Sequence, residues 1–421
     1  TEKKVGNLTL NLTSINVLLP ELQFRNTLDT SVTEVVFGRT EDYEDEIIGI
    51  EPKNVDVNRR GKIKMYVKGT KAYVLSNRKI YANPNAEHMF YDLKELTAVH
   101  FFNFDTGIVT DMRGMFRGCT KLTEVKNITS WNTKNVEDME FLFKDCPSLV
   151  SLDLSGWDTS KVKILYGTFY NCSGLTSLDV SKWNISAATN IGDTFYGCSS
   201  LTSLDVSKWN VAKVTQMHYI FYKCSSLTSL DVSTWDTAGV TDMSHMFRNC
   251  ARLTSLDVSS WDTSDIADMN SMFLDCGSLT SLDVSSWNTG KVSNMRQLFR
   301  DCSKLTAIDV SSWSTESATD MFCMFYGCSK LTSLDLSSWN TAGVADISHM
   351  FYSCGSLISV YVGSGWNTDN ASSSGMMFTL CKNLSGGKGT AYDEAHTDKA
   401  YARIDGGTAN PGYFTDIADK P

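Results

Sequence analysis

The chain has 421 residues, of which 42% are hydrophobic and 20% are charged, and this composition excludes a disordered protein. A net charge of −10 argues against a nucleic-acid partner, which needs a clustered basic surface. The sequence holds no run of 18 apolar residues, so we also expect no membrane insertion.

Residues 1–85 show no repeat and are expected to form a β-rich N-terminal capping domain. Four short runs rich in β-branched and aromatic residues predict strands: NLTLNL, VTEVVF, KIKMYV and KAYVLS. The tripeptide RRG predicts a turn between two of them. The chain opens with TEKKVGNLTL, which has no basic segment followed by an apolar one, so any signal peptide would lie outside this sequence.

Residues 86–381 carry a repeat of 26 residues, which predicts a solenoid of about eleven coils. All ten tryptophans lie in one row, from Trp131 to Trp366, at intervals of 26 or 27 residues. A phenylalanine row and a cysteine row keep the same period. Equal spacing predicts that members of a row stack on one another, so the tryptophans should be buried and the cysteines should be reduced residues of a shared core.

One coil shows how the repeat unit is expected to fold. In LTSLDVSTW, residues 227–235, Leu230 and Val232 alternate with Asp231, which predicts a strand that points Asp231 to the surface. In VTDMSHMFRNC, residues 240–250, apolar residues recur at helical spacing behind Asp242, which is suited to cap a helix. We therefore predict an α/β leucine-rich-repeat solenoid, with one strand of a parallel sheet and a short helix in each coil.

Residues 382–421 lose the period and are rich in glycine, so we expect a small C-terminal cap that ends the stack. This part and the preceding repeat contain none of the motifs H-E-x-x-H, C-x-x-C or G-x-S-x-G. No nucleophile, base and orienting group can be named, so we expect no enzyme activity and no cofactor.

The unit WDTAGVTDMSHMFRNCARLTSLDVSSW resembles the 26-residue repeats of BspA-like leucine-rich-repeat surface proteins of bacteria. The closing segment GTAYDEAHTDKAYARIDGGTANPGYFTD is similar to a module that often ends such arrays. The resemblance covers roughly residues 70–421. It implies a protein that is secreted or attached to the cell surface, and a role in adhesion to host proteins or other cells. The family brings no catalytic residues.

A row of aspartates occupies the outward strand position of eight successive coils. Carboxylates in such a row repel one another, so they should recruit cations, raise their own pKa values or accept hydrogen bonds. The functional hypothesis is a strip that binds calcium weakly or binds a cationic ligand. The alternative, which we favour, is a solvated face whose charges are offset by the serines two residues on. The candidates are Asp179, Asp205, Asp231, Asp257 and Asp283, flanked by Asp153, Asp309 and Asp335.

A second candidate surface is a tyrosine row. Tyr170, Tyr196 and Tyr222 each follow the core phenylalanine of their coil, and other coils hold Arg or Lys at this slot. A slot that accepts both residue types should face solvent, and Tyr and Arg are common at binding hot spots. Plain tolerance of a surface position is the alternative that we favour.

These observations predict an exported, non-enzymatic surface protein that presents a repeat scaffold to host or neighbouring-cell proteins or glycans. Many weak sites on one scaffold would combine through multivalency. The alternative is a passive spacer that holds another module away from the cell. We expect a monomer.

Overall fold

The computed structural model describes residues 2–5, 8–11 and 14–421. These residues form two compact units, one ending at Asn210 and one beginning at Val211. The boundary between the units falls inside the repeated region. The predicted division after residues 85 and 381 is not tested by this and stays a prediction.

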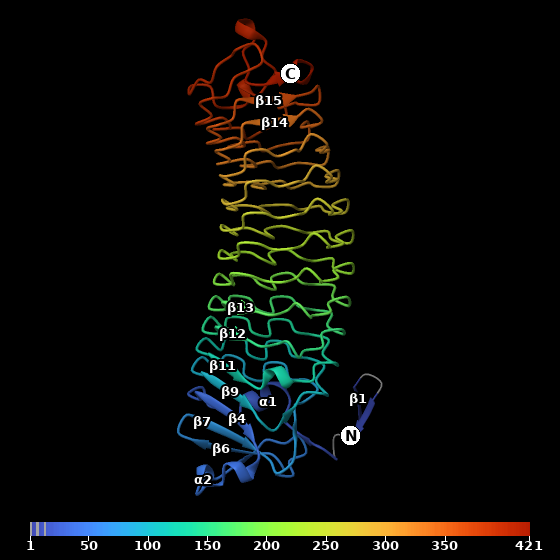
Figure 1. The fold of residues 1–421 in the computed structure, drawn as a ribbon, viewed down its shortest axis with the longest axis vertical. Helices are drawn as coiled ribbons and strands as arrows, with labels where there is room; N and C mark the ends of the chain where they lie inside the picture. Colours follow the sequence, from blue (N-terminus) through green and yellow to red (C-terminus); the bar gives the residue numbers. More distant parts are fainter. Residues whose placement is uncertain (1, 6–7, 12–13) are drawn as a thin grey trace. The chain divides into compact units, whose positions relative to one another are not determined.

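The first unit begins with a sheet of six strands, which are β4 Glu34–Gly38, β5 Lys53–Asn54, β6 Lys64–Lys68, β7 Lys71–Leu75, β9 Ala98–Phe101 and β11 Glu124–Lys126. Their order is β11-β9-β4-β7-β6-β5 (Figure 1). The pairs from β11 to β7 are parallel, and β6 and β5 add antiparallel edges. The predicted strands VTEVVF, KIKMYV and KAYVLS coincide with β4, β6 and β7.

Smaller elements complete this part of the first unit. Strand β2 covers the described residues of the predicted strand NLTLNL, while Asn7 and Leu12 lie outside them. Strand β8 lies between β10 and β3 in a parallel sheet. These elements are β1 Glu2–Val5, β2 Leu8–Asn11, β3 Asn16–Val17, α1 Glu21–Arg25, η1 Thr40–Asp42, α2 Glu44–Ile47, β8 Ile80–Tyr81 and β10 Phe104–Asp105.

The segment that precedes each cysteine is a ladder of hydrogen bonds between coils, so the predicted helix at residues 240–250 is wrong. The amides of His245, Phe247 and Asn249 donate to carbonyls of the following coil at 2.7–2.9 Å. The amides between them donate to the carbonyl three residues back in the same coil. His245 and Asn249 have positive φ angles of 57° and 62°, and this left-handed backbone breaks a helix at every fourth residue.

Parallel bridges align successive coils within each unit. Each bridge joins residues 26 or 27 positions apart, which confirms the register read from the sequence. The described part of residues 86–381 contains a single short helical turn, η2 Ile128–Ser130. The bridges run through Asn85, Asp111, Asp138, Ile164 and Asn190 in the first unit, and through Gln216, Asp242, Asp268, Asn294, Asp320, Asp346 and Ser373 in the second.

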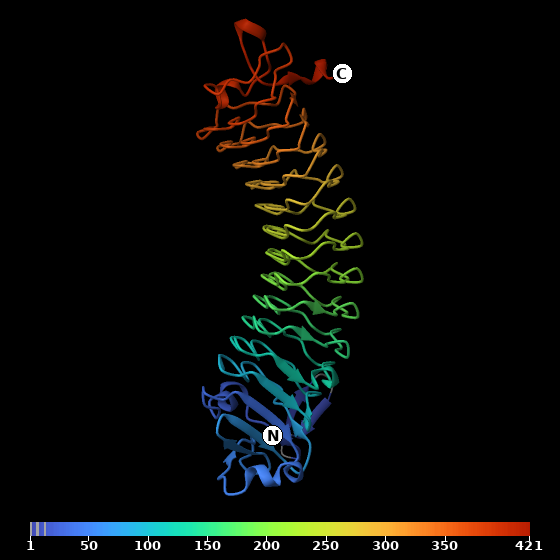
Figure 2. The same ribbon diagram turned by 60° about the vertical axis from the view of Figure 1, so that its left-hand side comes forward.

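The predicted strands form a regular parallel sheet in only part of each unit. Paired strands are β12 Ser151–Leu152 with β13 Ser177–Leu178, and β14 Ser333–Leu336 with β15 Ser359–Val362 and β16 Thr415–Asp416. In the described coils of residues 201–310 the same motif forms no assigned strand. Figure 2 shows these coils of the second unit as separate loops.

The spacing of successive coils differs between the tryptophan row and the bridge ladder. In the second unit the rings of Trp261 and Trp287 lie 6.5 Å apart, whereas those of Tyr326 and Tyr352, beside the bridge ladder, lie 4.7 Å apart. Strands that share hydrogen bonds lie ~4.8 Å apart. Each coil is therefore a wedge, thin at the ladder and thicker at the tryptophan. The indoles of Trp157 and Trp183 are also 6.3 Å apart where β12 pairs with β13, so indole spacing alone does not decide where strands pair.

The core of each unit is built from stacked rows, as the period predicted. Nine tryptophans, from Trp131 to Trp339, are buried, and adjacent indoles in each unit lie nearly parallel. The indole nitrogen of Trp261 donates to the carbonyl of Val232 at 3.1 Å, and the same bond recurs in further coils. All twelve cysteines are free and buried. The Cys302 thiol, for example, donates to the carbonyl of Phe273.

The second unit ends in a cap that packs the buried rings of Tyr413 and Phe414 on Phe378 and adds polar contacts. Strand β16 extends the parallel sheet of β14 and β15. Asp405 is buried and accepts hydrogen bonds from Lys388, Thr390 and Gly407, which lower its pKa to about 2 against the effect of burial. The helical turns of the cap are η3 Lys399–Tyr401, η4 Gly407–Ala409 and η5 Ile417–Asp419.

Candidate binding surface

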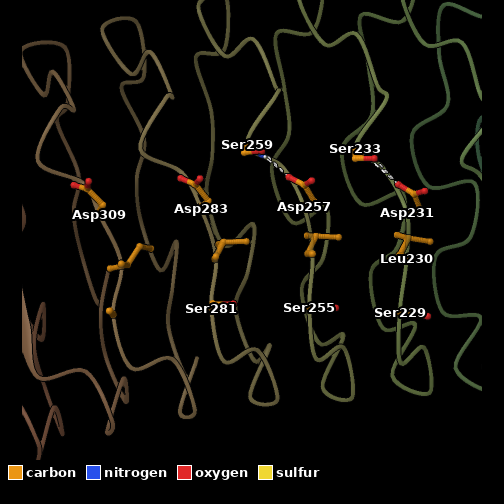
Figure 3. Close-up of a pocket in the computed structure, with 14 residues that line it drawn as sticks. Ser229, Leu230, Asp231, Ser233, Ser255, Asp257, Ser259, Ser281, Asp283 and Asp309 are labelled. Carbon is orange, nitrogen blue, oxygen red and sulfur yellow. Dashed lines mark hydrogen bonds between the residues drawn. The ribbon is translucent and has the colours of Figure 1, made fainter.

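The aspartate row lies on the surface because of the two-residue alternation of an extended chain. Leu256 and Val258 are buried in the core of the second unit, and Asp257 between them is exposed. The same alternation holds in the neighbouring coils. Figure 3 shows the carboxylates of Asp231 and Asp283 on either side of Asp257, one from each coil.

Each carboxylate of the row is held by the serine two residues on. The hydroxyl of Ser259 donates to Oδ1 of Asp257 at 2.7 Å, and its amide donates to the same atom at 3.1 Å. Both donors bond to Oδ1, so Oδ2 is left for solvent or a ligand. The same hydroxyl bond, at 2.6–2.7 Å, is made to Asp153, Asp179, Asp205, Asp231, Asp283 and Asp309.

These hydrogen bonds affect the pKa values of the aspartate carboxyls and favour their charged form. They lower the pKa values of five carboxyls below their ordinary value, the serine hydroxyl bond being the largest cause and the serine amide bond the second. The sequence analysis favoured the hypothesis that the serines stabilise the charged carboxylates. The lowered pKa values agree with it, and none of these five carboxyls has a raised pKa. The five residues are Asp153, Asp179, Asp205, Asp257 and Asp283.

The row borders a shallow groove in each unit. In the second unit the groove has a volume of about 850 Å³ and is lined by four coils. Its sides are the aspartates and the serines, and its apolar lining comes from Leu230, Leu256, Leu282 and Ile308 (Figure 3). In the first unit a smaller groove of about 470 Å³ is lined by Asp153, Asp179 and Asp205.

The backbone of the groove is open, because the described coils that line it form no assigned strand. Among the described residues, the amides of Leu256 and Asp257 donate to no protein acceptor. The surface therefore offers one free carboxylate oxygen and unpaired backbone groups in each coil. Such a face can accept and donate hydrogen bonds along its length, and its charge favours cationic partners.

The tyrosine row is divided between the two units. In the first unit Tyr170 stacks on Tyr196 with ring centroids 4.2 Å apart, and the ammonium of Lys144 covers the other side of Tyr170 at 4.2 Å. In the second unit the guanidinium of Arg248 lies 5.6 Å from the ring of Tyr222. All three tyrosines are half-buried. Neighbours therefore occupy both faces of the Tyr170 ring.

The bridge ladder holds polar residues that sequence reasoning did not single out as a site. Asp242, read as a helix cap, instead accepts the amide of Ser244 at 2.8 Å in a turn. Asp138 occupies the same slot in the first unit, and burial raises its pKa to about 6. The signal was available as a row of Asp and Asn at intervals of 26 or 27 residues.

Among the described residues, no three His, Cys, Asp or Glu side chains come together as metal ligands would. Calcium binding by the aspartate row stays a hypothesis. No helix in the described ranges is long and apolar enough to cross a bilayer.

Comparison with solved structures also finds matching chains. One match is a chain from a structure described as the crystal structure of a TLR13–ssRNA13 complex, at 16% identity and a TM-score of 0.23. The match covers 73% of this chain and 50% of that chain, so this chain spans about half its length. No curated protein matches the sequence.

A sequence family matches the repeated region three times in tandem. Its matches cover residues 84–203, 189–283 and 277–389, which together are well over half of the chain. The tandem matches agree with the bridges that align the coils of each unit. The chain therefore belongs to the family described as Mycoplasma protein of unknown function, DUF285.

Proposed function

We propose that this chain is a leucine-rich-repeat solenoid of the BspA-like type, exported to the bacterial surface, where its repeats bind proteins as a non-enzymatic adhesion scaffold. The observation that carries this proposal is the aspartate groove. Identical carboxylates recur once per coil, each with Oδ1 occupied by serine and Oδ2 free. Repetition of one weak contact is how a repeat scaffold gains affinity.

The charge and spacing of the groove favour one class of partner. A row of carboxylates repels acidic glycans and attracts lysine- or arginine-rich protein segments. In an extended peptide, alternate side chains lie ~6.6 Å apart on one face. The indoles of successive coils lie 6.1–6.5 Å apart in this part of the second unit. An extended segment with a cation at every second residue would therefore meet one carboxylate per coil.

The test compares two peptides and two double variants. A peptide of alternating Lys and Ser should bind more tightly than a peptide of the same composition with its lysines in one block. Replacing Asp257 and Asp283 with Asn should weaken binding about fivefold, taking ~0.5 kcal/mol for each exposed charge pair. Calorimetric titration at low and high salt measures both differences.

A matched control removes the same charge from the same unit. Asp236 and Asp262 are exposed, and each accepts an amide two residues on through Oδ1, which Asn can also do. The double variant Asp236→Asn, Asp262→Asn should bind the alternating peptide as the wild type does. Equal binding of the two peptides, or equal loss in the two double variants, would count against the groove.

The alternative function is a passive spacer, and one observation favours it. The stacked indoles, phenylalanines and thiols make a self-supporting core in each unit that needs no ligand. A spacer should bind neither cationic peptides nor host-matrix proteins or glycans on an unbiased array. Surface labelling of bacteria that produce the full-length gene product tests the proposed location, which both functions share. Mass measurement in solution tests the expected monomer.

A further inference from the structure

The N-terminal part of the first unit contains a basic groove that the repeat does not share. The groove has a volume of about 440 Å³, within the range of small-molecule sites. Its cations are Lys62, Lys64 and Arg78, and none of its described lining residues is acidic. In a chain of net charge −10, a groove with only positive charge stands apart from its surroundings.

The three cations are exposed and are not used in the fold. No ion pair with Lys62, Lys64 or Arg78 occurs among the described residues. The nearby lysines of the same sheet differ, because Lys68 pairs with Glu46 and Lys71 pairs with Glu34. The charge of the groove is therefore free to meet a ligand.

The backbone that presents these cations is held in place. Asp56 is buried and accepts the amides of Arg60 and Lys62 at 2.9 and 2.8 Å. This pair of bonds closes the loop before β6, so that Lys62 and Lys64 come from one fixed hairpin. Arg78 comes from the loop after β7, the strand that pairs with β6.

Two hydroxyl groups in the lining, those of Ser76 and Tyr66, have hydrogen atoms to donate. Ser76 is 3% exposed and accepts hydrogen bonds from Asn16 Nδ2 at 3.0 Å and from the amide of Arg78 at 3.3 Å. Both acceptor positions of its oxygen are thus occupied, and its hydrogen has no acceptor among the described residues. Tyr66 is 9% exposed, and its hydroxyl has no partner in the same set.

We propose that this groove binds the tetrahedral oxyanion of a phosphate or sulfate monoester. Three cations supply the opposing charge, and the hydroxyls of Ser76 and Tyr66 supply directed donors for two of its oxygens. A carboxylate has only two oxygens and would leave part of this donor set unused. The site is separate from the aspartate groove and goes beyond the proposed adhesion function, since it takes ligands of opposite charge.

The experiment titrates the full chain with glucose phosphate and glucose sulfate by calorimetry, with glucuronate and glucose as controls. The esters should bind, with phosphate tighter if a dianion is preferred and sulfate tighter if a monoanion is preferred, and either order supports the site. The double variant Lys64→Gln, Arg78→Gln should weaken binding at least tenfold, and Tyr66→Phe about fivefold. Circular dichroism melting should not change for the double variant, whose side chains are exposed.

The control Lys330→Gln removes an exposed, unpaired lysine from the second unit and should leave binding unchanged. Three results would overturn the proposal: no saturable heat with either ester at millimolar concentration, equal binding of glucuronate, or a loss in Lys330→Gln as large as in the double variant. Because Tyr66→Phe keeps the ring and its packing, unchanged affinity in a correctly folded Tyr66→Phe protein would remove the hydroxyl from the site.

Discussion

Removing the indole of Trp261 should destabilise the second unit by about 4 kcal/mol. Trp261 is 2% exposed, and its ring stacks between Trp235 at 6.3 Å and Trp287 at 6.5 Å. Truncation of a buried tryptophan to alanine costs ~3–5 kcal/mol through lost contacts and the cavity that remains. The lost bond to the Val232 carbonyl adds less than ~1 kcal/mol, because that carbonyl also accepts the amide of Trp235.

The loss should be local, because each coil contacts only its neighbours in a stack. Urea unfolding followed by circular dichroism measures the total loss, and hydrogen exchange by mass spectrometry locates it. Exchange should rise most in residues 227–292 and much less near β14 and β15. Trp261→Phe should lose about half as much, because the smaller ring retains part of the stack.

Trp366→Ala is the matched control within the same unit. Trp366 is only half-buried, where it meets the ring of Phe414 at 5.0 Å, and its indole donates to Ala402 in the cap. Its loss should cost about half of the Trp261 value, since less area is buried. A cost below ~1.5 kcal/mol for Trp261→Ala, or exchange that rises evenly through the unit, would refute the stacked-core reasoning.

Three further predictions concern the ladder and the thiols. Asn249→Val should destabilise the second unit by ~1–2 kcal/mol in urea unfolding, because φ is 62° there and a β-branched residue avoids that region, whereas Asn249→Gly should be tolerated. Asp138 is partly buried, and burial raises its pKa from the ordinary 3.8 to about 6. Its contribution to the free energy of unfolding is therefore present at low pH and is lost as pH rises from about 4 through 6. Asp138→Asn should reduce this loss by ~1 kcal/mol after allowance for screening, and identical pH profiles of the melting temperature in the two proteins would contradict it. The core cysteines should resist a thiol reagent at pH 8 until urea is added, because burial raises the pKa of Cys276 and its equivalents and blocks access; rapid labelling of the folded chain would be inconsistent with that burial.

The mistaken helix shows a limit of apolar periodicity. Val240, Met243, Phe247 and Cys250 follow helical spacing and are all buried, so their burial was predicted correctly. Periodicity predicts which side chains face the core, but it does not predict to which carbonyl each backbone amide donates its hydrogen bond. Here alternate backbone amides donate hydrogen bonds to carbonyls of the next coil, and the chain turns at residues with a left-handed backbone conformation. Gly, Asn and Asp recur at one of these positions, and this was the signal for positive φ that the spacing argument passed over.

Some features of the candidate surface were also predictable from the sequence, and others were not. The exposure of Asp257 and its row followed from strand alternation, and the part played by Ser259 followed from its position two residues on. The sequence could not predict that the indoles of Trp261 and Trp287 lie 6.5 Å apart, because that spacing depends on how the rings pack between coils. Nor could it predict the basic groove, since Lys62, Lys64 and Arg78 come together only when β6 pairs with β7.

By itself, the sequence determined the period, the register of the coils and the identity of the buried rows, because equal spacing puts like residues in like places within a stack. The tertiary structure decided the hydrogen-bond partners of the ladder, the wedge shape of each coil and the free oxygen of the groove aspartates Asp231, Asp257 and Asp283. These depend on distances between coils, and a distance between coils results from packing two surfaces whose contacts are set by the whole unit rather than by any one repeat.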